Sequence, residues 1–396
     1  MKSRLICLLC LFVFLLPGVS LAAESRMPAM LDDLQTDILI LPEGLKRIES
    51  KAFSGSRAER IAFPDSLEWI APDAFQGCTA TGYASWNSCG WNYCLDSSNS
   101  LTLAPALHVY RRTEEEIRKF FEEHPVSDKV TFTKPVSTNP YAPGVLSPET
   151  VSSALNLLNR YRFVAGLDAN VAFDASLEPK ESAACILSAL NNSLSHYPSR
   201  PAKLSGAQYD ELYNLGYEGA GKSNLGWGTD VSLAESIRMY MSDSDEYNIG
   251  MLGHRRWILN PTMGVTAFGY YNHFCALYTF DKSNSAALQS YVVWPAQKTP
   301  VSMFSKSDAW SISFGKNVYK DEIVVHLERL SDSKTWDFSS SSADGYFNVN
   351  NNNYGQVGCV IFQPKNIKIA EGTAFRVTVT NKRDNSVIIY NVEFFK

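Results

Sequence analysis

The sequence predicts a secreted, multidomain α+β protein, and three observations support this prediction. A 22-residue repeat occupies the first part of the chain, helical periodicity dominates the middle, and short β-branched or alternating runs fill the last hundred residues. With 396 residues, 45% of them hydrophobic, the chain is long enough for two or three separate cores. The net charge of −5 and the absence of a long basic run argue against nucleic acid as a partner.

The first 22 residues have the pattern of a secretion signal. Lys2 and Arg4 precede a continuous apolar run at residues 5–16, and small residues at 20–22 offer a cleavage site. The run is too short to span a bilayer, which takes about 20 apolar residues. We therefore expect residues 1–22 to be removed, and the mature chain to be secreted or held at a cell surface without a transmembrane segment of its own.

Cysteine usage fits this compartment without predicting a disulfide scaffold. Of eight cysteines, Cys7 and Cys10 lie in the signal, which leaves six in the mature chain. Six are too few to hold so long a chain, and no C-x-x-C pair remains for a metal. Cys89 and Cys94 are close enough in sequence to pair, and buried free thiols are the alternative.

The repeat predicts a short solenoid. Residues 41–55 recur as residues 63–77, with matched positions 22 apart, and a fixed period of this size is typical of stacked units. The pattern resembles the bacterial-surface (BspA-type) leucine-rich repeat, and residues 82–93 are similar to its closing turn. We expect this solenoid over residues 36–100. The resemblance implies a binding surface, with a simple spacer as the alternative.

Residues 101–143 are expected to connect the solenoid to the middle domain, with one short helix near residues 113–121 and an extended, proline-rich end. The next helix begins with Ser147 as its cap and Pro148 at its first position, and Gly166 ends it. Beyond it we expect three helices, a tight turn and two strands, at residues 177–194, 205–215, 231–241, 221–226, 265–270 and 274–280.

The last part of the chain, residues 291–396, predicts an all-β sandwich. Its short strand-like runs are separated by Gly, Asn and Ser at the regular spacing of an antiparallel sandwich of immunoglobulin-like size. Residues 348–353 are expected to form a loop by composition. His326 is expected to be a packed or edge histidine, and the region carries no catalytic grouping.

Four motifs in the middle of the chain carry a resemblance to a known family. They are Leu-Asn-Arg-Tyr-Arg at residues 158–162, Ser-His-Tyr-Pro at 195–198, Ser-Asn-Leu at 223–225, and the stretch from Gly253-His254 to Gly264. Their order and spacing resemble the CAP superfamily (cysteine-rich secretory proteins, antigen 5, pathogenesis-related 1) in its bacterial secreted form. The resemblance covers residues 144–290 and implies an α-β-α sandwich.

The same resemblance implies a cleft with two histidines and two acids. His196 and His254 match the two histidines, and Asp243 matches the second acid. Ser223 stands where better-known relatives carry a glutamate. Of the arginines after His254, one is expected to pair with Asp243 or Asp245 and the other to be a solvated surface charge.

Two interpretations of the histidine pair stay open. Two neutral imidazoles aimed into one cleft are good ligands for Zn²⁺. On this interpretation His196 and His254 bind a divalent metal ion, either Zn²⁺ or Ca²⁺. The alternative is that the two rings hydrogen-bond across the cleft and lock two helix ends together.

The function that follows is an extracellular binding module, since relatives sequester lipids or bind proteins and this chain flanks the CAP-like region with two interaction-type domains. The expected partner is an extracellular protein, a lipid or a wall polymer. The alternative is a metal-dependent or histidine-assisted hydrolase acting on a peptide, ester or cell-wall substrate, in which Ser223, His254 and Asp243 could form a triad.

Overall fold

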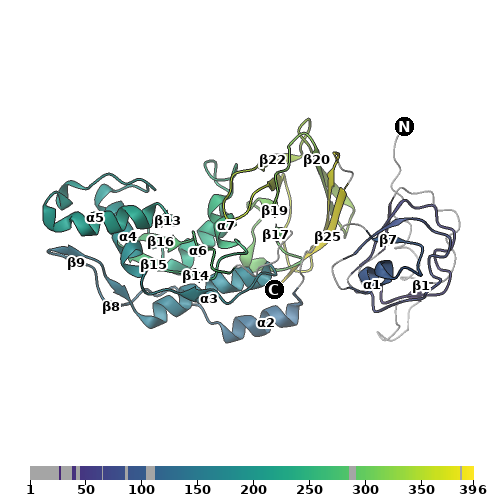
Figure 1. Ribbon diagram of the computed structural model, residues 1–396, viewed down its shortest axis with the longest axis horizontal. Coiled ribbons are helices and arrows are strands. Elements are labelled where there is room, and N and C mark those ends of the chain that lie inside the picture. Colours follow the sequence, from purple (N-terminus) through teal and green to yellow (C-terminus); the bar gives the residue numbers. More distant parts are fainter. Residues whose placement is uncertain are drawn as a thin grey trace. The chain divides into compact units, whose positions relative to one another are not determined.

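The computed structural model describes residues 26–27, 38–41, 45–64, 66–84, 88–103, 112–284, 291–383 and 386–396. The predicted signal at residues 1–22 lies outside these residues. The chain divides into two compact units, Met1–His108 and Val109–Lys396, and both contain helices and strands (Figure 1). The protein is therefore a multidomain α+β protein.

Short parallel strands build the first unit. One sheet has the order β1-β3-β5 and the other the order β2-β4-β6-β7. The register follows the repeat, because Arg47 lies beside Trp69 and Ile48 beside Ile70. A short helix, α1 (Cys89–Leu95), follows β6. The strands are β1 (Arg26–Met27), β2 (Ile38–Ile40), β3 (Arg47–Ile48), β4 (Arg60–Ala62), β5 (Trp69–Ile70), β6 (Thr81–Tyr83) and β7 (Thr102–Leu103).

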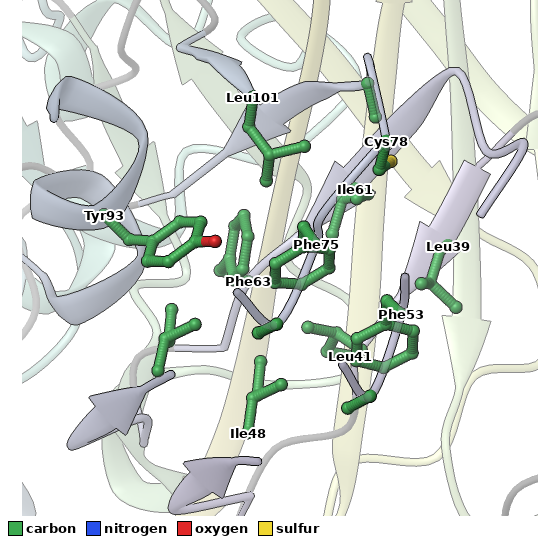
Figure 2. Close-up of a cluster of buried hydrophobic side chains, with 14 of the residues drawn as sticks. Leu39, Leu41, Ile48, Phe53, Ile61, Phe63, Phe75, Cys78, Tyr93 and Leu101 are labelled. Carbon is green, nitrogen blue, oxygen red and sulfur yellow. The ribbon is translucent and has the colours of Figure 1, made fainter. Parts of the chain in front are cut away.

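Stacked aromatic rings fill the core of this unit. Phe53 and Phe75, one repeat apart, stack with ring centroids at 5.0 Å. Phe63 and Tyr93 complete the contacts of Phe75 at 5.5 and 5.7 Å, and Figure 2 shows Phe75 in the middle of the group. The period thus places equivalent rings in contact along the stack, as expected where each unit buries its apolar side on the next.

The segment expected as a connector is divided between the units. Strand β7 lies in the first unit, whereas residues 112–143 belong to the second. There α2 (Glu114–Glu123) begins with a capping box between Thr113 and Glu116, and Phe120 stacks on Phe163 at 4.1 Å. Two hairpins follow, built from β8 (Phe132–Lys134) with β11 (Val145–Leu146) and β9 (Ser137–Thr138) with β10 (Tyr141–Ala142).

The helical part of the second unit has three layers. The sheet β13-β16-β15 lies in the middle. Helices α4 and α5 lie side by side over one face (Figure 1), and α6 packs on β13 from the other face. The helices are α3 (Pro148–Val164), α4 (Glu178–Asn191), α5 (Asp210–Ala220), α6 (Leu233–Ser242) and α7 (Gly253–Ile258), with 3₁₀ turns at Ala202–Leu204 and Ala207–Tyr209. The strands are β12 (Ala172–Phe173), β13 (Ser223–Trp227), β14 (Val265–Thr266), β15 (Phe268–Tyr271) and β16 (Phe274–Tyr278).

Two sheets packed face to face form the C-terminal part. Their orders are β17-β19-β23-β22 and β18-β25-β24-β20-β21. Trp310 of the first sheet contacts Phe375 of the second with ring centroids at 5.5 Å, and Phe362 contacts Phe338 at 5.2 Å. The strands are β17 (Val292–Trp294), β18 (Lys298–Pro300), β19 (Trp310–Ser313), β20 (Ile323–Arg329), β21 (Lys334–Phe338), β22 (Gly345–Asn350), β23 (Cys359–Pro364), β24 (Ala374–Asn381) and β25 (Ser386–Phe395), with a 3₁₀ turn at Val301–Met303.

Two local predictions were right only in part. Residues 221–222 form the expected turn, but residues 223–226 belong to strand β13, which pairs with β16 over its full length. Residues 351–353 lie outside any strand as expected, but residues 348–350 are the end of strand β22. In both places Gly, Ser and Asn indicated a turn, but tertiary hydrogen bonds satisfy their polar groups within a sheet.

The six cysteines after residue 22 are all free thiols, five of them buried. None of the helices in the described ranges is both long enough and apolar enough to span a bilayer.

Candidate functional site

The site is built around the short helix α7, which holds His254 near its start. The N-cap of this helix is Leu252, in a left-handed conformation with φ of 48°, and it offers no side-chain cap. Asp243, itself at the C-cap of α6, supplies the missing acceptor, because its Oδ2 accepts the backbone N–H of Arg255 at 3.3 Å. A carboxylate at this end also complements the helix dipole.

The other end of α7 rests on Arg162 of α3. This guanidinium is fully buried and donates to the carbonyl oxygens of Ile258 and Asn260 at 2.9 and 2.7 Å. A cation at the C-terminal carbonyls satisfies acceptors that a helix leaves open. Arg162, the last residue of the motif at residues 158–162, thus holds the C-terminal end of the helix that carries His254.

His254 is held by three neighbours. Its Nδ1 lies 2.8 Å from Oδ1 of Asp243, its carbonyl accepts from Asn224 Nδ2 at 2.9 Å, and its ring stacks on Tyr240 at 5.3 Å. Burial alone would lower the pKa of His254, but the hydrogen bond and charge of Asp243, together with the charge of Asp245, outweigh it and raise the pKa. The side chain of His254 keeps 24% of its surface exposed, against 1% for Asp243.

His196 lies in the exposed segment after α4. Its Nδ1 lies 2.8 Å from the carbonyl oxygen of Ala220, the last residue of α5. His196 is thus bonded to Ala220 and His254 to Asn224. These two partners are four residues apart in one short segment. Within the described residues, no hydrogen bond joins the two rings, and each Nδ1 has a different acceptor.

The two histidines therefore share one feature of metal-binding histidines. A ligating imidazole commonly donates its second ring N–H to a carboxylate or carbonyl, which fixes the tautomer and leaves the other nitrogen to bind. The acceptors on Nδ1 of His196 and His254 favour this tautomer, with Nε2 left for a ligand. The described part of the chain holds no group of three or more His, Cys, Asp or Glu side chains placed to share a metal ion. Each ring on its own therefore has Nε2 without a protein partner among the described residues.

Ser223 faces away from His254. Its Oγ donates to Oε2 of Glu181 on α4 at 2.6 Å, while the next residue, Asn224, reaches His254 on the other side of the strand. Successive side chains of a strand point to opposite faces. Asp243 and His254 are thus brought together, and Ser223 is placed on the opposite face of β13.

Glu181 is a buried acid that the sequence analysis missed. It is fully buried, and burial raises its pKa to about 8, although the hydrogen bond from Ser223 lowers the pKa in part. Its Oε1 has no hydrogen-bond partner among the described residues. The available signal was an acid on the apolar stripe of a helix, four residues before Cys185.

The arginines after His254 differ from the prediction that one pairs with Asp243 or Asp245 and the other is solvated, because both are buried. The Arg256 guanidinium bonds to Asn350, Asn352 and Gln356 of the C-terminal sandwich. The Arg255 guanidinium donates to the backbone carbonyls of Met241, Ser242 and Ala309. Both side chains therefore fasten α7 to its surroundings and to the sandwich.

Comparisons with known proteins add no family. No family model and no curated protein matches the chain. Among solved structures, the chain is similar to one described as the archaellum periplasmic stator protein complex FlaF and FlaG from Sulfolobus acidocaldarius, at 12% identity, covering 21% of this chain and 74% of that one. The TM-score is 0.16.

Proposed function

We propose that this protein is an extracellular binding protein whose CAP-like middle domain holds a divalent cation, Zn²⁺ or Ca²⁺, between His196 and His254. The observation that carries the proposal is the common state of the two rings. Each has Nδ1 on an oxygen acceptor, at 2.8 Å in both cases, which leaves Nε2 for a ligand.

The surroundings of His254 support binding more than turnover. Two imidazoles leave the remaining positions of a cation for water or for a ligand atom. Asp243 is committed to Nδ1 of His254 and to the N–H of Arg255, so it orients the ring and is not a spare ligand. We propose a role in contact with an extracellular protein, a lipid or a wall polymer, with the repeat unit and the sandwich as flanking interaction domains of a secreted or surface protein.

Calorimetric titration of the metal-free protein with Zn²⁺ and with Ca²⁺ tests the proposal. His254→Ala and His196→Ala should each weaken binding of the preferred ion at least about tenfold, since each removes one of two ligands. A matched control exists in His326, whose Nδ1 also lies on a carboxylate, Asp337 at 2.6 Å, but in the sandwich. His326→Ala should bind as the wild type does, and equal affinity in all three variants would exclude the pair as the site.

The alternative is a histidine-assisted hydrolase. The observation in its favour is the buried carboxylate that orients His254, which is the arrangement of a general base and its orienting acid. Because Ser223 points to Glu181, the nucleophile would have to be a water molecule. Equal background turnover of esters, peptides and wall fragments by the wild type and by His254→Ala would rule this alternative out.

A further inference from the structure

Five tyrosines form a row along helix α5 and the segments beside it. Tyr213 and Tyr217 are four residues apart and so lie on one side of α5, and Tyr209, the N-cap of this helix, precedes Tyr213 by the same spacing. Tyr141 contacts Tyr209 at one end with ring centroids at 6.4 Å, and Tyr197 contacts Tyr217 at the other end at 6.5 Å. We call these five residues the tyrosine row.

The row is held in place by packing and is open to solvent. Tyr141, Tyr209 and Tyr213 are half-buried against the core between α4 and α5, which fixes their rings before any ligand arrives. Tyr197 and Tyr217 are 77% and 42% exposed, which is a high exposure for large rings that touch each other. An exposed patch of contacting aromatic rings marks an interaction surface.

The shape of the row indicates a linear ligand. Eight residues of helix separate Tyr209 from Tyr217, which is about 12 Å at the usual rise. Tyr141 and Tyr197 extend the row at both ends. The surface is thus longer than one small molecule and is one ring wide, which suits an extended polymer that repeats the same contact along its length.

The charges beside the row indicate a neutral ligand. Arg200 lies over the ring of Tyr213 at 5.4 Å and is paired with Asp210 at 2.6 Å. Glu218, next to Tyr217, is paired with both Lys180 and Lys222. A charged ligand would have to compete with these ion pairs, whereas a neutral one would not.

The chemistry of the tyrosine side chain indicates the class of ligand. A tyrosine ring offers a flat apolar face and a hydroxyl at its edge, with little rotamer freedom to lose on binding. A membrane-inserting surface carries several Leu, Phe or Trp side chains beside basic residues. Among the exposed large hydrophobic side chains of the described residues, the aliphatic one nearest in sequence to Tyr197 is Leu194, which is 44% exposed. A single leucine does not make such a surface. Sugar rings present apolar C–H faces and hydroxyl edges, which match both parts of a tyrosine. We propose that the tyrosine row binds a neutral polysaccharide chain, with sugar rings stacked on successive tyrosines.

Native-gel affinity electrophoresis of the full chain tests this proposal. The gels contain hydroxyethylcellulose, glucomannan or glycol chitin as neutral probes, and polygalacturonate as the charged probe. EDTA is present throughout, so the result does not depend on the cation proposed for the histidine pair. We expect retardation by at least one neutral probe, and about tenfold weaker binding for Tyr197→Ala/Tyr217→Ala.

Three comparisons make the result decisive. Tyr197→Phe/Tyr217→Phe should keep most of the affinity, because the stacking faces remain. Tyr319→Ala, at another ring that is 47% exposed, should bind as the wild type does. The melting temperature of the double-alanine variant should be unchanged, and the single Tyr197→Ala variant gives a second, milder test.

The proposal is overturned by any of four outcomes. They are no retardation by the neutral probes, retardation by polygalacturonate alone, equal loss in Tyr319→Ala, and co-flotation with phosphatidylcholine vesicles that the double-alanine variant loses. The last outcome would assign the surface to membranes.

Discussion

Asp243 and His254 are joined by a hydrogen bond of 2.8 Å between Oδ1 and Nδ1, and only the ring remains in contact with solvent. The carboxylate fixes the imidazole and simultaneously accepts the backbone N–H of Arg255. One buried acid therefore sets both the orientation of the ring and the start of the helix that carries it.

Asp243→Asn should weaken cation binding about 10–100-fold, the usual cost of losing such a supporting carboxylate. The same change should lower the pKa of His254, because the charge and hydrogen bond that raise it are removed. Calorimetry measures the affinity, and NMR titration of the ring protons measures the pKa. Asp245→Asn is the matched control for affinity, since this exposed acid bonds to Asn248 and acts on His254 only through its charge. An equal loss of affinity in both variants would contradict the role given to Asp243.

Glu181→Gln should remove a pH dependence of stability. Because burial raises the pKa of Glu181 to about 8, the folded state keeps its proton at pH values where the unfolded state has lost it. The free energy of unfolding should therefore fall as pH rises from the ordinary glutamate range to about 8, by at most about 1.4 kcal/mol per pH unit. Urea unfolding at pH 5, 7 and 8.5 checks this slope.

The glutamine variant should lose this component of the slope and be more stable than the wild type at pH 8.5, since it cannot ionise. Glu211→Gln, at an exposed position on α5, serves as the control and should follow the wild type. Parallel curves for the wild type and Glu181→Gln would show that Glu181 does not titrate in this range.

Arg255→Met should destabilise the second unit by about 3 kcal/mol or more, because buried carbonyl oxygens lose their donor. Those of Met241 and Ala309 lie 2.6 and 2.5 Å from the guanidinium. Calorimetric unfolding measures the loss, and limited proteolysis reports whether the sandwich separates. Arg238→Met, which removes exposed ion pairs, should cost no more than about 1 kcal/mol. Comparable losses in the two variants would count against the bridging role.

Phe75→Ala should destabilise the first unit by about 3–5 kcal/mol, as expected for a fully buried phenylalanine. Because the chain forms two compact units, only the calorimetric transition of the first unit should shift. Leu95→Ala, at a residue that is 59% exposed in the same unit, should change stability by about 0.5 kcal/mol or less. A shift of both transitions would mean that the two units unfold together.

Local signals in the sequence predicted much of the secondary structure. The 22-residue period placed Phe53 and Phe75 in equivalent positions, and their rings stack. Ser147 and Pro148 predicted the start of α3, where the serine side chain caps the helix. These features depend on neighbours in sequence or on a fixed period, so a single chain is enough to see them.

Contacts between distant residues could not be predicted in the same way. Ser223 and Asn224 are adjacent, yet their partners, Glu181 and His254, lie 42 and 30 residues away. Which face of a strand meets which helix depends on the register of the whole sheet. The triad considered from residue types alone therefore combined Ser223 on one face of β13 with His254 and Asp243 on the other.

The two arginines after His254 have a consequence for domain exchange. Arg255 reaches Ala309, 54 residues later in the chain, and Arg256 reaches Gln356, 100 residues later. A chain cut or fused near residue 290 would keep the motifs at residues 158–162, 195–198, 223–225 and 253–264 and still lose these partners. Two guanidiniums would then be exposed directly beside His254, and the helix would lose part of its support. The histidine-bearing region and the sandwich should therefore be exchanged between proteins only as a pair.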